Sequence, residues 1–271
     1  MSVTIQEAAA RGDDPTVRHI VSISGGKDSA ALAIYIKRHY PGIRAEYVFC
    51  DTGCELPETY EYLERLEALL GARVVHLSAL DLLGIEKKPG RNPFDIWLNE
   101  VYGGFLPSPR TRWCTRVLKI APFEKYIGTD QAFSYIGIRA DENRDGYVAK
   151  KPPKISDQPN IIPVYPFKDD GLGIADIREI LEESGIGAPD YYRWRSRSGC
   201  YFCFYQQIGE WQRLKEEHPD LFEAAKRYEK AEGEKRYTWD STRTLDEIAA
   251  LPLRAPLPVI DDTDGCAICH L

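Results

Sequence analysis

The residues best suited to chemistry near the N-terminus form a short loop rich in glycine and hydroxyl groups. It consists of six consecutive residues: Ser24, Gly25, Gly26, Lys27, Asp28 and Ser29. Glycines allow backbone N–H groups to close around phosphate oxygens, and the N-terminus of a helix adds about half a positive charge there. Lys27 adds a full charge, while Asp28 is suited to cap the helix or to help hold Mg²⁺. The loop therefore predicts a nucleotide-binding site.

This pattern differs from the two common phosphate-binding motifs. The Walker A motif needs four residues between its first glycine and a Gly-Lys pair, and the loop lacks them, as it lacks GxGxxG. An ordinary glycine-rich turn between a strand and a helix is the alternative interpretation. The lysine, the aspartate and both serines in one hexapeptide favour nucleotide binding.

Paired cysteines are the second chemical feature. Cys200 and Cys203 form one CxxC pair, Cys266 and Cys269 form another, and 62 residues separate the pairs. Two such pairs are able to form a tetrahedral Cys₄ zinc site. The seven cysteines are odd in number and no secretory signal accompanies them, which argues against a disulfide framework and favours metal or thiol chemistry.

Basic residues gather beside these cysteines. One cluster surrounds Cys114 and consists of Arg110, Arg112, Arg116 and Lys119. The other precedes Cys200, with Arg193, Arg195 and Arg197 interleaved with Tyr191, Tyr192 and Trp194. The functional interpretation is a clamp for a triphosphate and for a nucleic-acid backbone, and the alternative is solvated surface charge. The net charge of −7 argues against a generally basic surface.

The elements that must position these residues alternate between strand and helix. Strands are expected at residues 20–24, 45–51, 73–77 and 133–139, and helices at 28–40, 57–70 and 115–126. Segments 80–112 and 140–160 are expected to be mostly loop. Such alternation predicts a parallel sheet covered on both faces. Arg139, at the end of the fourth strand, is expected to face the phosphates, because parallel sheets bind ligands at the carboxyl ends of their strands.

Beyond residue 160 the pattern changes to a short strand, a helix at 174–184, the first CxxC turn and a helix at 207–232. We therefore expect an α/β fold with a Rossmann-like, twisted, mostly parallel five-stranded sheet. A nucleotide-binding domain is expected at 1–160 and a smaller helical region with the CxxC pairs at 161–271, separated by a soft boundary. The longest apolar run, residues 30–36, is too short to cross a membrane, so we expect a cytoplasmic protein.

Six segments in this order resemble the PP-loop superfamily of ATP pyrophosphatases and phosphoadenylyl-sulfate reductases. They are SGGKDS at 24–29, DTG and PET within 51–60, the segment 113–122 around Cys114, GIR with its later arginine at 137–144, PVYP at 163–166 and SGCYFC at 198–203. The chain is most similar to the DndC-like group of DNA phosphorothioation, whose members carry a 4Fe–4S cluster. The resemblance implies an adenine nucleotide alpha hydrolase-like fold that binds ATP with Mg²⁺. It implies further nucleotide contacts at Asp51, Thr52, Gly53, Arg116, Gly137 and Arg139.

The activity implied is adenylation of an acceptor with release of pyrophosphate, followed by sulfur insertion. Lys27, Asp28, Arg139 and Lys119 are the expected catalytic residues. The expected cluster ligands are Cys114, Cys200, Cys203 and one of Cys266 and Cys269, with zinc as the alternative metal. Cys50 and Cys54 are expected to be structural.

The expected partners are DNA or another nucleic acid as acceptor and a sulfur donor such as a cysteine desulfurase. Three alternatives remain: reduction of phosphoadenylyl or adenylyl sulfate, thiolation of tRNA, and a nucleotide-binding subunit without catalysis. The C-terminal Cys269-His270 resembles the tail of the reductases but lacks their glycine.

Overall fold

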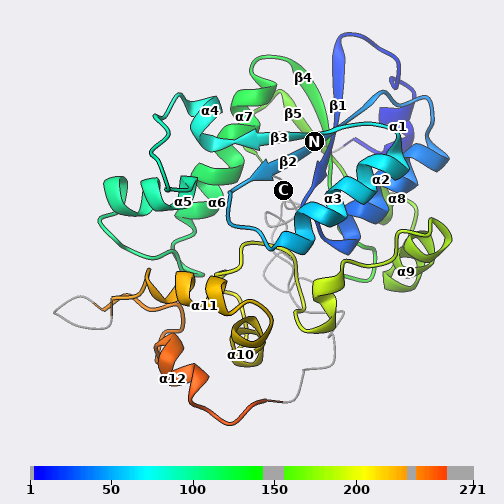
Figure 1. Ribbon diagram of the computed structural model, residues 1–271. Coiled ribbons are helices and arrows are strands. Elements are labelled where there is room, and N and C mark those ends of the chain that lie inside the picture. Colours follow the sequence, from blue (N-terminus) through cyan, green and yellow to red (C-terminus); the bar gives the residue numbers. More distant parts are fainter. Residues whose placement is uncertain (1–2, 143–155, 231–235, 255–271) are drawn as a thin grey trace.

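Five parallel strands form the centre of the protein, and the computed structural model describes residues 3–142, 156–230 and 236–254. The strands are β1 (Val17–Ile23), β2 (Ala45–Asp51), β3 (Val74–Ser78), β4 (Gln131–Tyr135) and β5 (Ile161–Val164). Their order in the sheet is β3-β2-β1-β4-β5, and every neighbouring pair is parallel (Figure 1). This confirms the expected α/β fold. The sheet takes its fifth strand from beyond residue 160, so it draws on both of the expected regions.

The strand order reverses between β1 and β4, so the chain leaves these neighbouring strands in opposite directions. Crevices for ligands form at the carboxyl ends of strands at such a point. There β1 leads into the glycine-rich loop and β4 leads into Gly137. A Cβ atom at Gly137 would lie 3.2 Å from the carbonyl oxygen of Asp28, so the absence of a side chain lets the two segments approach closely.

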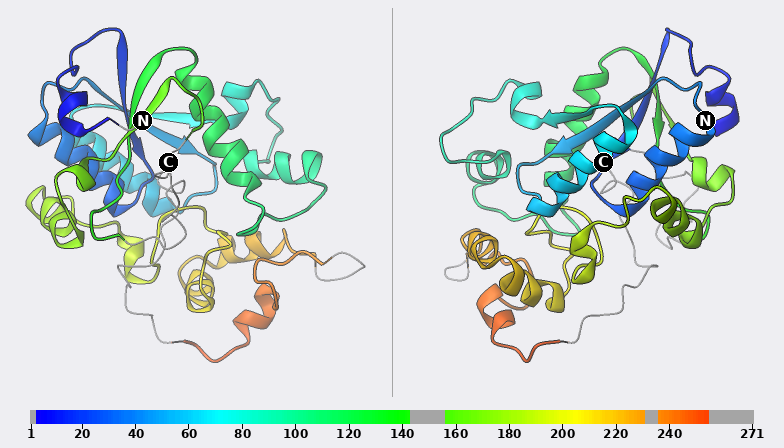
Figure 2. Two further views of the ribbon diagram at one scale, coloured as in Figure 1. Left: turned by 180° about the vertical axis from the view of Figure 1, so that it is seen from behind. Right: turned by 45° about the vertical axis from the view of Figure 1, so that its right-hand side comes forward.

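Helices cover both faces of the sheet (Figure 2). One face packs against α1 (Ile5–Ala9), α2 (Lys27–His39), α3 (Pro57–Leu70), α8 (Pro166–Asp169) and α9 (Ile174–Glu183). The other face packs against α4 (Ala79–Leu83), the π-helical turn η2 (Arg116–Ile120) and α7 (Ala121–Ile127). In α3, proline at the first helical position and Gly71 in the left-handed region at the C-terminal end set the boundaries that the sequence predicts.

A second group of helices lies beside the carboxyl end of the sheet, at the left and the bottom of Figure 1. It contains α5 (Pro93–Ile96), the π-helical turn η1 (Trp97–Val101), α6 (Trp113–Thr115), the 3₁₀ turn η4 (Asp190–Arg193), α10 (Ile208–Glu217), α11 (Pro219–Lys226) and α12 (Leu245–Ala249). Its core is aromatic, with Phe94, Phe202, Trp211 and Trp239 all buried. The CxxC turn at Cys200 is part of this packing, between the helices and the sheet.

The observed elements differ from the expected ones in three places. Segment 80–112 is mostly loop, as expected, but it also contains α5, η1 and the end of α4. The helix expected at 207–232 is broken at His218, since Pro219 lacks the N–H that would continue the first helix, and residues 231–235 lie outside the described part. The helix expected at 115–126 begins at Trp113 and contains the π turn η2. Within the described residues, no helix is both long and apolar enough to span a membrane.

Candidate nucleotide and thiol site

The loop at residues 24–29, called the phosphate loop below, connects β1 to α2 and is held by its own hydroxyl groups. Ser29 Oγ accepts a hydrogen bond from the backbone N–H of Ser24 at 3.0 Å and donates one to the carbonyl oxygen of Gly26 at 3.0 Å. Gly25 has a φ of 74°, and a Cβ atom there would lie 2.5 Å from Cγ2 of Thr59. Both facts require glycine at this position. The hydrogen bonds of Ser29 and the glycine at position 25 therefore fix the conformation of the loop.

Buried charges lie directly behind the phosphate loop. Arg139 Nη1 donates to Asp28 Oδ1 at 2.9 Å, and both side chains are almost completely buried. Arg139 Nε also donates to Asp141 Oδ1 at 3.0 Å. Burial alone would lower the pKa of Arg139, but the carboxylate of Asp28 outweighs it and raises that pKa, so the guanidinium stays charged. Gly26 is the N-cap of α2 and no side chain caps it, so Asp28 pairs with Arg139 and does not cap the helix.

Lys27 is the first residue of α2, and its side chain is 14% exposed. Its Nζ is 3.4 Å from Asp28 Oδ2 and 5.1 Å from the centre of the Tyr192 ring. Burial disfavours the charged form, yet the neighbouring Tyr192 and Asp28 raise the pKa of Lys27 overall. Lys27 is therefore a cation at the mouth of the phosphate loop, which suits contact with a phosphate.

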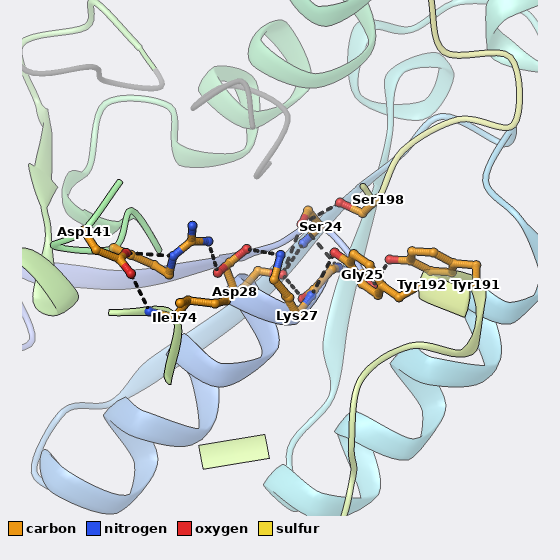
Figure 3. A network of polar contacts seen from close by, with 12 residues as sticks. Ser24, Gly25, Lys27, Asp28, Asp141, Ile174, Tyr191, Tyr192 and Ser198 are labelled. Atoms are coloured by element: carbon orange, nitrogen blue, oxygen red, sulfur yellow. Dashed lines mark hydrogen bonds and ion pairs between the residues drawn. The ribbon is translucent and has the colours of Figure 1, made fainter. Parts of the chain in front are cut away.

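Residues 191–198 cover the phosphate loop (Figure 3). The hydroxyl of Tyr191 donates to the carbonyl oxygen of Gly25 at 2.7 Å, and that of Tyr192 lies 3.4 Å from the backbone nitrogen of Lys27. Ser198 Oγ donates to Ser24 Oγ at 3.4 Å. A Cβ atom at position 26 would lie 2.8 Å from Ser198 Oγ. The hydroxyl of Tyr192 thus faces a loop amide and that of Ser198 faces the Ser24 hydroxyl, where phosphate oxygens are expected to bind.

A small cavity of about 50 Å³, called the thiol pocket below, lies next to this cover. Three of the cysteines expected to bind metal line it: Cys114, Cys200 and Cys203. Cys200 Sγ is 3.2 Å from Thr52 Oγ1, and Lys119 also lines the wall. Burial raises the pKa of Cys114 to about 11 and that of Cys200 further still, so both are neutral thiols near neutral pH.

The donor types in the thiol pocket fit a metal–thiolate centre, because three sulfurs from two distant segments face one space. Cys114 lines the pocket together with the first CxxC pair. A zinc site made only of the two CxxC pairs would not need Cys114 there. In residues 3–142, 156–230 and 236–254, however, no three His, Cys, Asp or Glu side chains are grouped so as to hold a metal ion. Cys266 and Cys269 lie outside the described residues.

The phosphate loop and the thiol pocket meet at one residue. Ser198 lines the thiol pocket and its hydroxyl contacts Ser24 in the phosphate loop. Thr52 connects the sheet to the thiol pocket, because it directly follows β2 and its hydroxyl contacts Cys200. A ligand bound on the loop amides would therefore lie beside the three thiols.

Other predicted residues after β2 form a polar network. Asp51 Oδ1 accepts hydrogen bonds from the backbone N–H of Gly53 at 2.8 Å and from the hydroxyl of Tyr60 at 2.9 Å. Glu55, which the sequence analysis did not single out, is buried, and its carboxylate accepts a hydrogen bond from the hydroxyl of Thr52 at 2.7 Å. Burial raises the pKa of Glu55. No local pattern could reveal it, because a glutamate in a polar turn is normally exposed.

The basic clusters divide into different roles. Arg195 is buried and donates to the carbonyl oxygens of Gly199 and Cys200, and Arg193 pairs with Glu217, so the prediction that these two form a clamp is wrong. Arg197 lines the thiol pocket, and its Nε and Nη1 have no hydrogen-bond partner among the described residues. Arg116 is largely exposed and pairs with Glu124, so the structure does not bring it to the thiol pocket.

The two remaining cysteines are structural, as expected. Cys50 and Cys54 are each 1% exposed and pack into the apolar clusters around the sheet and the second group of helices. Burial raises the pKa of Cys50 to about 12. Both side chains are therefore inert, neutral thiols.

Comparison with known proteins connects this geometry to a family. The phosphoadenosine phosphosulfate reductase domain matches residues 18–206. An uncharacterised protein of Methanocaldococcus jannaschii is 28% identical over 211 residues, which are 75% of this chain and 40% of that protein. This chain thus spans less than half the length of that relative.

Two solved structures show weaker likenesses. One is a phosphoadenylyl-sulfate reductase from Candida auris in complex with phosphate, with 12% identity, a TM-score of 0.47 and coverage of 74% of this chain and 97% of the other. The second is the U34-tRNA thiolase NcsA from Methanococcus maripaludis with its 4Fe–4S cluster, with 13% identity, a TM-score of 0.41 and coverage of 90% and 86%.

Proposed function

Because the chain belongs to the phosphoadenosine phosphosulfate reductase domain family, we propose that it is an ATP pyrophosphatase and sulfurtransferase. It would adenylate an acceptor and then replace the activated oxygen with sulfur. The observation that supports this most directly is Ser198, which contacts the phosphate loop and also lines the pocket of three cysteines. A nucleotide on the loop and sulfur in the pocket would therefore be neighbours.

The first step is nucleotide binding and adenylation. The backbone amides of residues 25–27 and the ammonium group of Lys27 would bind the β- and γ-phosphates of ATP, with Mg²⁺ neutralising their charge. An acceptor oxygen attacks the α-phosphorus, the bond from that phosphorus to the pyrophosphate oxygen breaks, and pyrophosphate leaves. Arg139 would act through Asp28, because its guanidinium is bound to that carboxylate directly behind the loop. We therefore assign Arg139 a positioning role.

The second step is sulfur insertion. Hydrosulfide, released from the persulfide of a cysteine desulfurase by a thiol reductant, attacks the adenylated atom of the acceptor. The bond to the AMP oxygen breaks, AMP leaves with the electron pair, and the sulfur keeps its oxidation state. Arg197 and Lys119 line the thiol pocket and would attract the incoming anion.

The thiol pocket also suggests a cofactor. Cys114, Cys200, Cys203 and one of Cys266 and Cys269 would hold a 4Fe–4S cluster, which would supply a redox-active centre beside the incoming sulfur. Binding of the metal would favour the thiolate forms over the neutral thiols that burial otherwise favours.

We propose a nucleic acid as the acceptor, and DNA in particular, as in the DndC-like proteins that the motifs resemble. A non-bridging phosphate oxygen of DNA already carries negative charge, so its attack on ATP requires no general base. Arg112 and Arg197 both lie over the ring of Tyr205 at the thiol pocket, 5.8 Å and 5.2 Å from its centre. Cations and an aromatic ring in one place suit a nucleic-acid strand.

Pyrophosphate release with ATP, Mg²⁺ and short DNA duplexes tests the proposal. Replacing Lys27 with alanine removes the cation at the loop mouth, and we expect the rate to fall by about two orders of magnitude or more. Lys87→Ala, in an exposed lysine paired with Asp81, is the matched control and should keep the wild-type rate. Release by Lys27→Ala at the wild-type rate would contradict the role of the phosphate loop.

A second function, reduction of phosphoadenylyl or adenylyl sulfate, is favoured by the description of the matching family. Incubation with either adenylyl sulfate and a dithiol reductant separates the two functions. A sulfurtransferase yields no sulfite under these conditions, whereas sulfite formation would favour the reductase.

A further inference from the structure

A second cavity, of about 380 Å³, borders the CxxC turn, and none of the roles above uses it. Cys200 lines the thiol pocket, and the next residue, Tyr201, lines this cavity. Its walls come from α5 and η1, from the turn at Gly104 and from the end of α11. We call it the acceptor cavity. One turn of the chain separates it from the site of the proposed chemistry.

The floor of the acceptor cavity is polar and already ordered. The Tyr228 hydroxyl donates a hydrogen bond to Asp95 Oδ1 at 2.6 Å, and Asn92 Nδ2 donates one to the Tyr228 oxygen at 3.3 Å. Asp95 Oδ2 accepts the backbone N–H of Asn92 at 3.1 Å, so both carboxylate oxygens are occupied. Asn99 adds an exposed amide from η1, and Tyr201 and Tyr228 add aromatic surface. This combination provides hydrogen-bonding edges beside rings, as recognition of a nucleobase requires.

The rim of the acceptor cavity carries two cations. Arg227, directly after α11, is exposed, and its side chain makes no ion pair or hydrogen bond within the described part of the chain. Lys230 Nζ contacts the carbonyl oxygen of Gly103 at 3.4 Å and is otherwise exposed to solvent. Among the described residues, Asp95 is the only acid that lines the cavity. In a chain of net charge −7, this local excess of positive charge favours an anionic ligand.

We propose that the acceptor cavity binds one nucleotide unit of the acceptor strand. Its phosphate would contact Arg227 and Lys230, and its base would lie against Tyr201, Tyr228 and Asn99. This inference rests on the proposed function, because it supposes a nucleic-acid acceptor, and it adds where and how that strand is held. The base must be unpaired to enter, so the ligand is a single strand or a strand opened locally. The π-helical turn η1 borders the cavity, and such turns are frequent at functional sites.

Fluorescence anisotropy with labelled single strands of DNA and RNA of one sequence tests the inference. The double variant Arg227→Ala/Lys230→Ala should bind the preferred strand about tenfold more weakly at low salt. The slope of log affinity against log salt should fall by about 1.4, which corresponds to two lost phosphate contacts on a single strand. Lys125→Ala, another exposed lysine, is the control and should change neither quantity. Comparison of the DNA strand with the RNA strand shows which of the two nucleic acids the cavity binds.

An abasic position in the strand separates base recognition from charge. Wild-type protein should bind the abasic strand more weakly than the intact strand, and Asn99→Ala should reduce that difference. Unchanged affinity and salt slope in the double variant would overturn the inference. So would wild-type protein that releases pyrophosphate from ATP but binds neither strand. Loss of ATP binding in the wild type would instead overturn the proposed function, so the two failures are distinguishable.

Discussion

The phosphate loop and the thiol pocket share Ser198 but are built in different ways. The phosphate loop is continuous in sequence, and its hydroxyls and backbone groups bind one another within six residues. The thiol pocket combines Thr52, Cys114 and the turn at Cys200, which are far apart in sequence. Local chemistry determines the first site, whereas the second depends on how the helices pack against the sheet. We therefore expect changes in the two regions to have separable effects.

Removing one sulfur of the thiol pocket should have the largest effect. Cys200→Ser is expected to abolish iron binding after anaerobic reconstitution, and with it sulfur insertion, because serine is a poor ligand for iron in a thiolate cluster. ATP-dependent pyrophosphate release should persist, since the phosphate loop is unchanged. Iron counts and the absorption near 400 nm measure the first effect.

Cys50→Ala is the matched control, because Cys50 is also a free thiol but is buried in the core of the sheet. It should retain the iron of the wild type. Full iron content in Cys200→Ser, or loss of iron in a correctly folded Cys50→Ala, would show that the pocket is not the metal site.

Tyr191 and Tyr192 contact different groups of the phosphate loop, and replacing either should have a smaller effect than replacing Cys200. Tyr191→Phe leaves the buried carbonyl oxygen of Gly25 without its 2.7 Å hydrogen bond. It should lower the free energy of unfolding by about 1–2 kcal/mol. Tyr192→Phe removes only a 3.4 Å contact at the loop mouth and should leave stability close to that of the wild type.

The same pair should respond differently to nucleotide. Tyr192→Phe should change ATP affinity more than it changes stability, because its hydroxyl faces the amide that a phosphate would bind. Urea denaturation and isothermal titration with a non-hydrolysable ATP analogue measure the two quantities. Equal stability losses in both variants would contradict this division of roles.

The smallest expected effect concerns pH. His76 Nδ1 is 3.2 Å from Asp51 Oδ2, and that contact raises the pKa of His76. A raised histidine pKa adds stability that is complete below about pH 6.5 and is lost as pH rises through the folded-state pKa. The His76 side chain is 42% exposed, so the effect should stay below about 1 kcal/mol.

Urea midpoints for wild type and His76→Asn between pH 6 and 8.5 check this dependence. The difference between the two proteins should shrink as pH rises. A difference in urea midpoint that grows with pH would contradict a raised pKa of His76. The pKa of Asp51 is lowered, so its own contribution is lost only in acid, outside this range.

The sequence predicted most of the sheet because local signals determine it. The bounds of β2 and α3 agree with the prediction, since Pro57 and Gly71 mark the helix and an apolar run marks the strand. It predicted the phosphate loop for the same reason. It missed α5 and η1, where glycine and proline suggested a loop while buried Phe94 and Leu98 pack the segment into the second group of helices.

The residues whose roles were mistaken or missed are buried charged ones. Arg195 looked like a free cation, but the fold buries it, and it donates to carbonyl oxygens only four and five residues away. Glu55 was not singled out, although its partners Thr52 and Tyr60 are only three and five residues away. A sequence shows which residues are neighbours along the chain, whereas the burial of a charged side chain among them depends on segments that are distant in sequence.

A crystal structure with Mg²⁺ and a non-hydrolysable ATP analogue tests the central claim most directly. The account predicts a triphosphate on the backbone amides of residues 25–27 and on Lys27, with the α-phosphorus on the side of the thiol pocket. Density for the triphosphate at any other place, or an α-phosphorus turned away from Cys200, would contradict it.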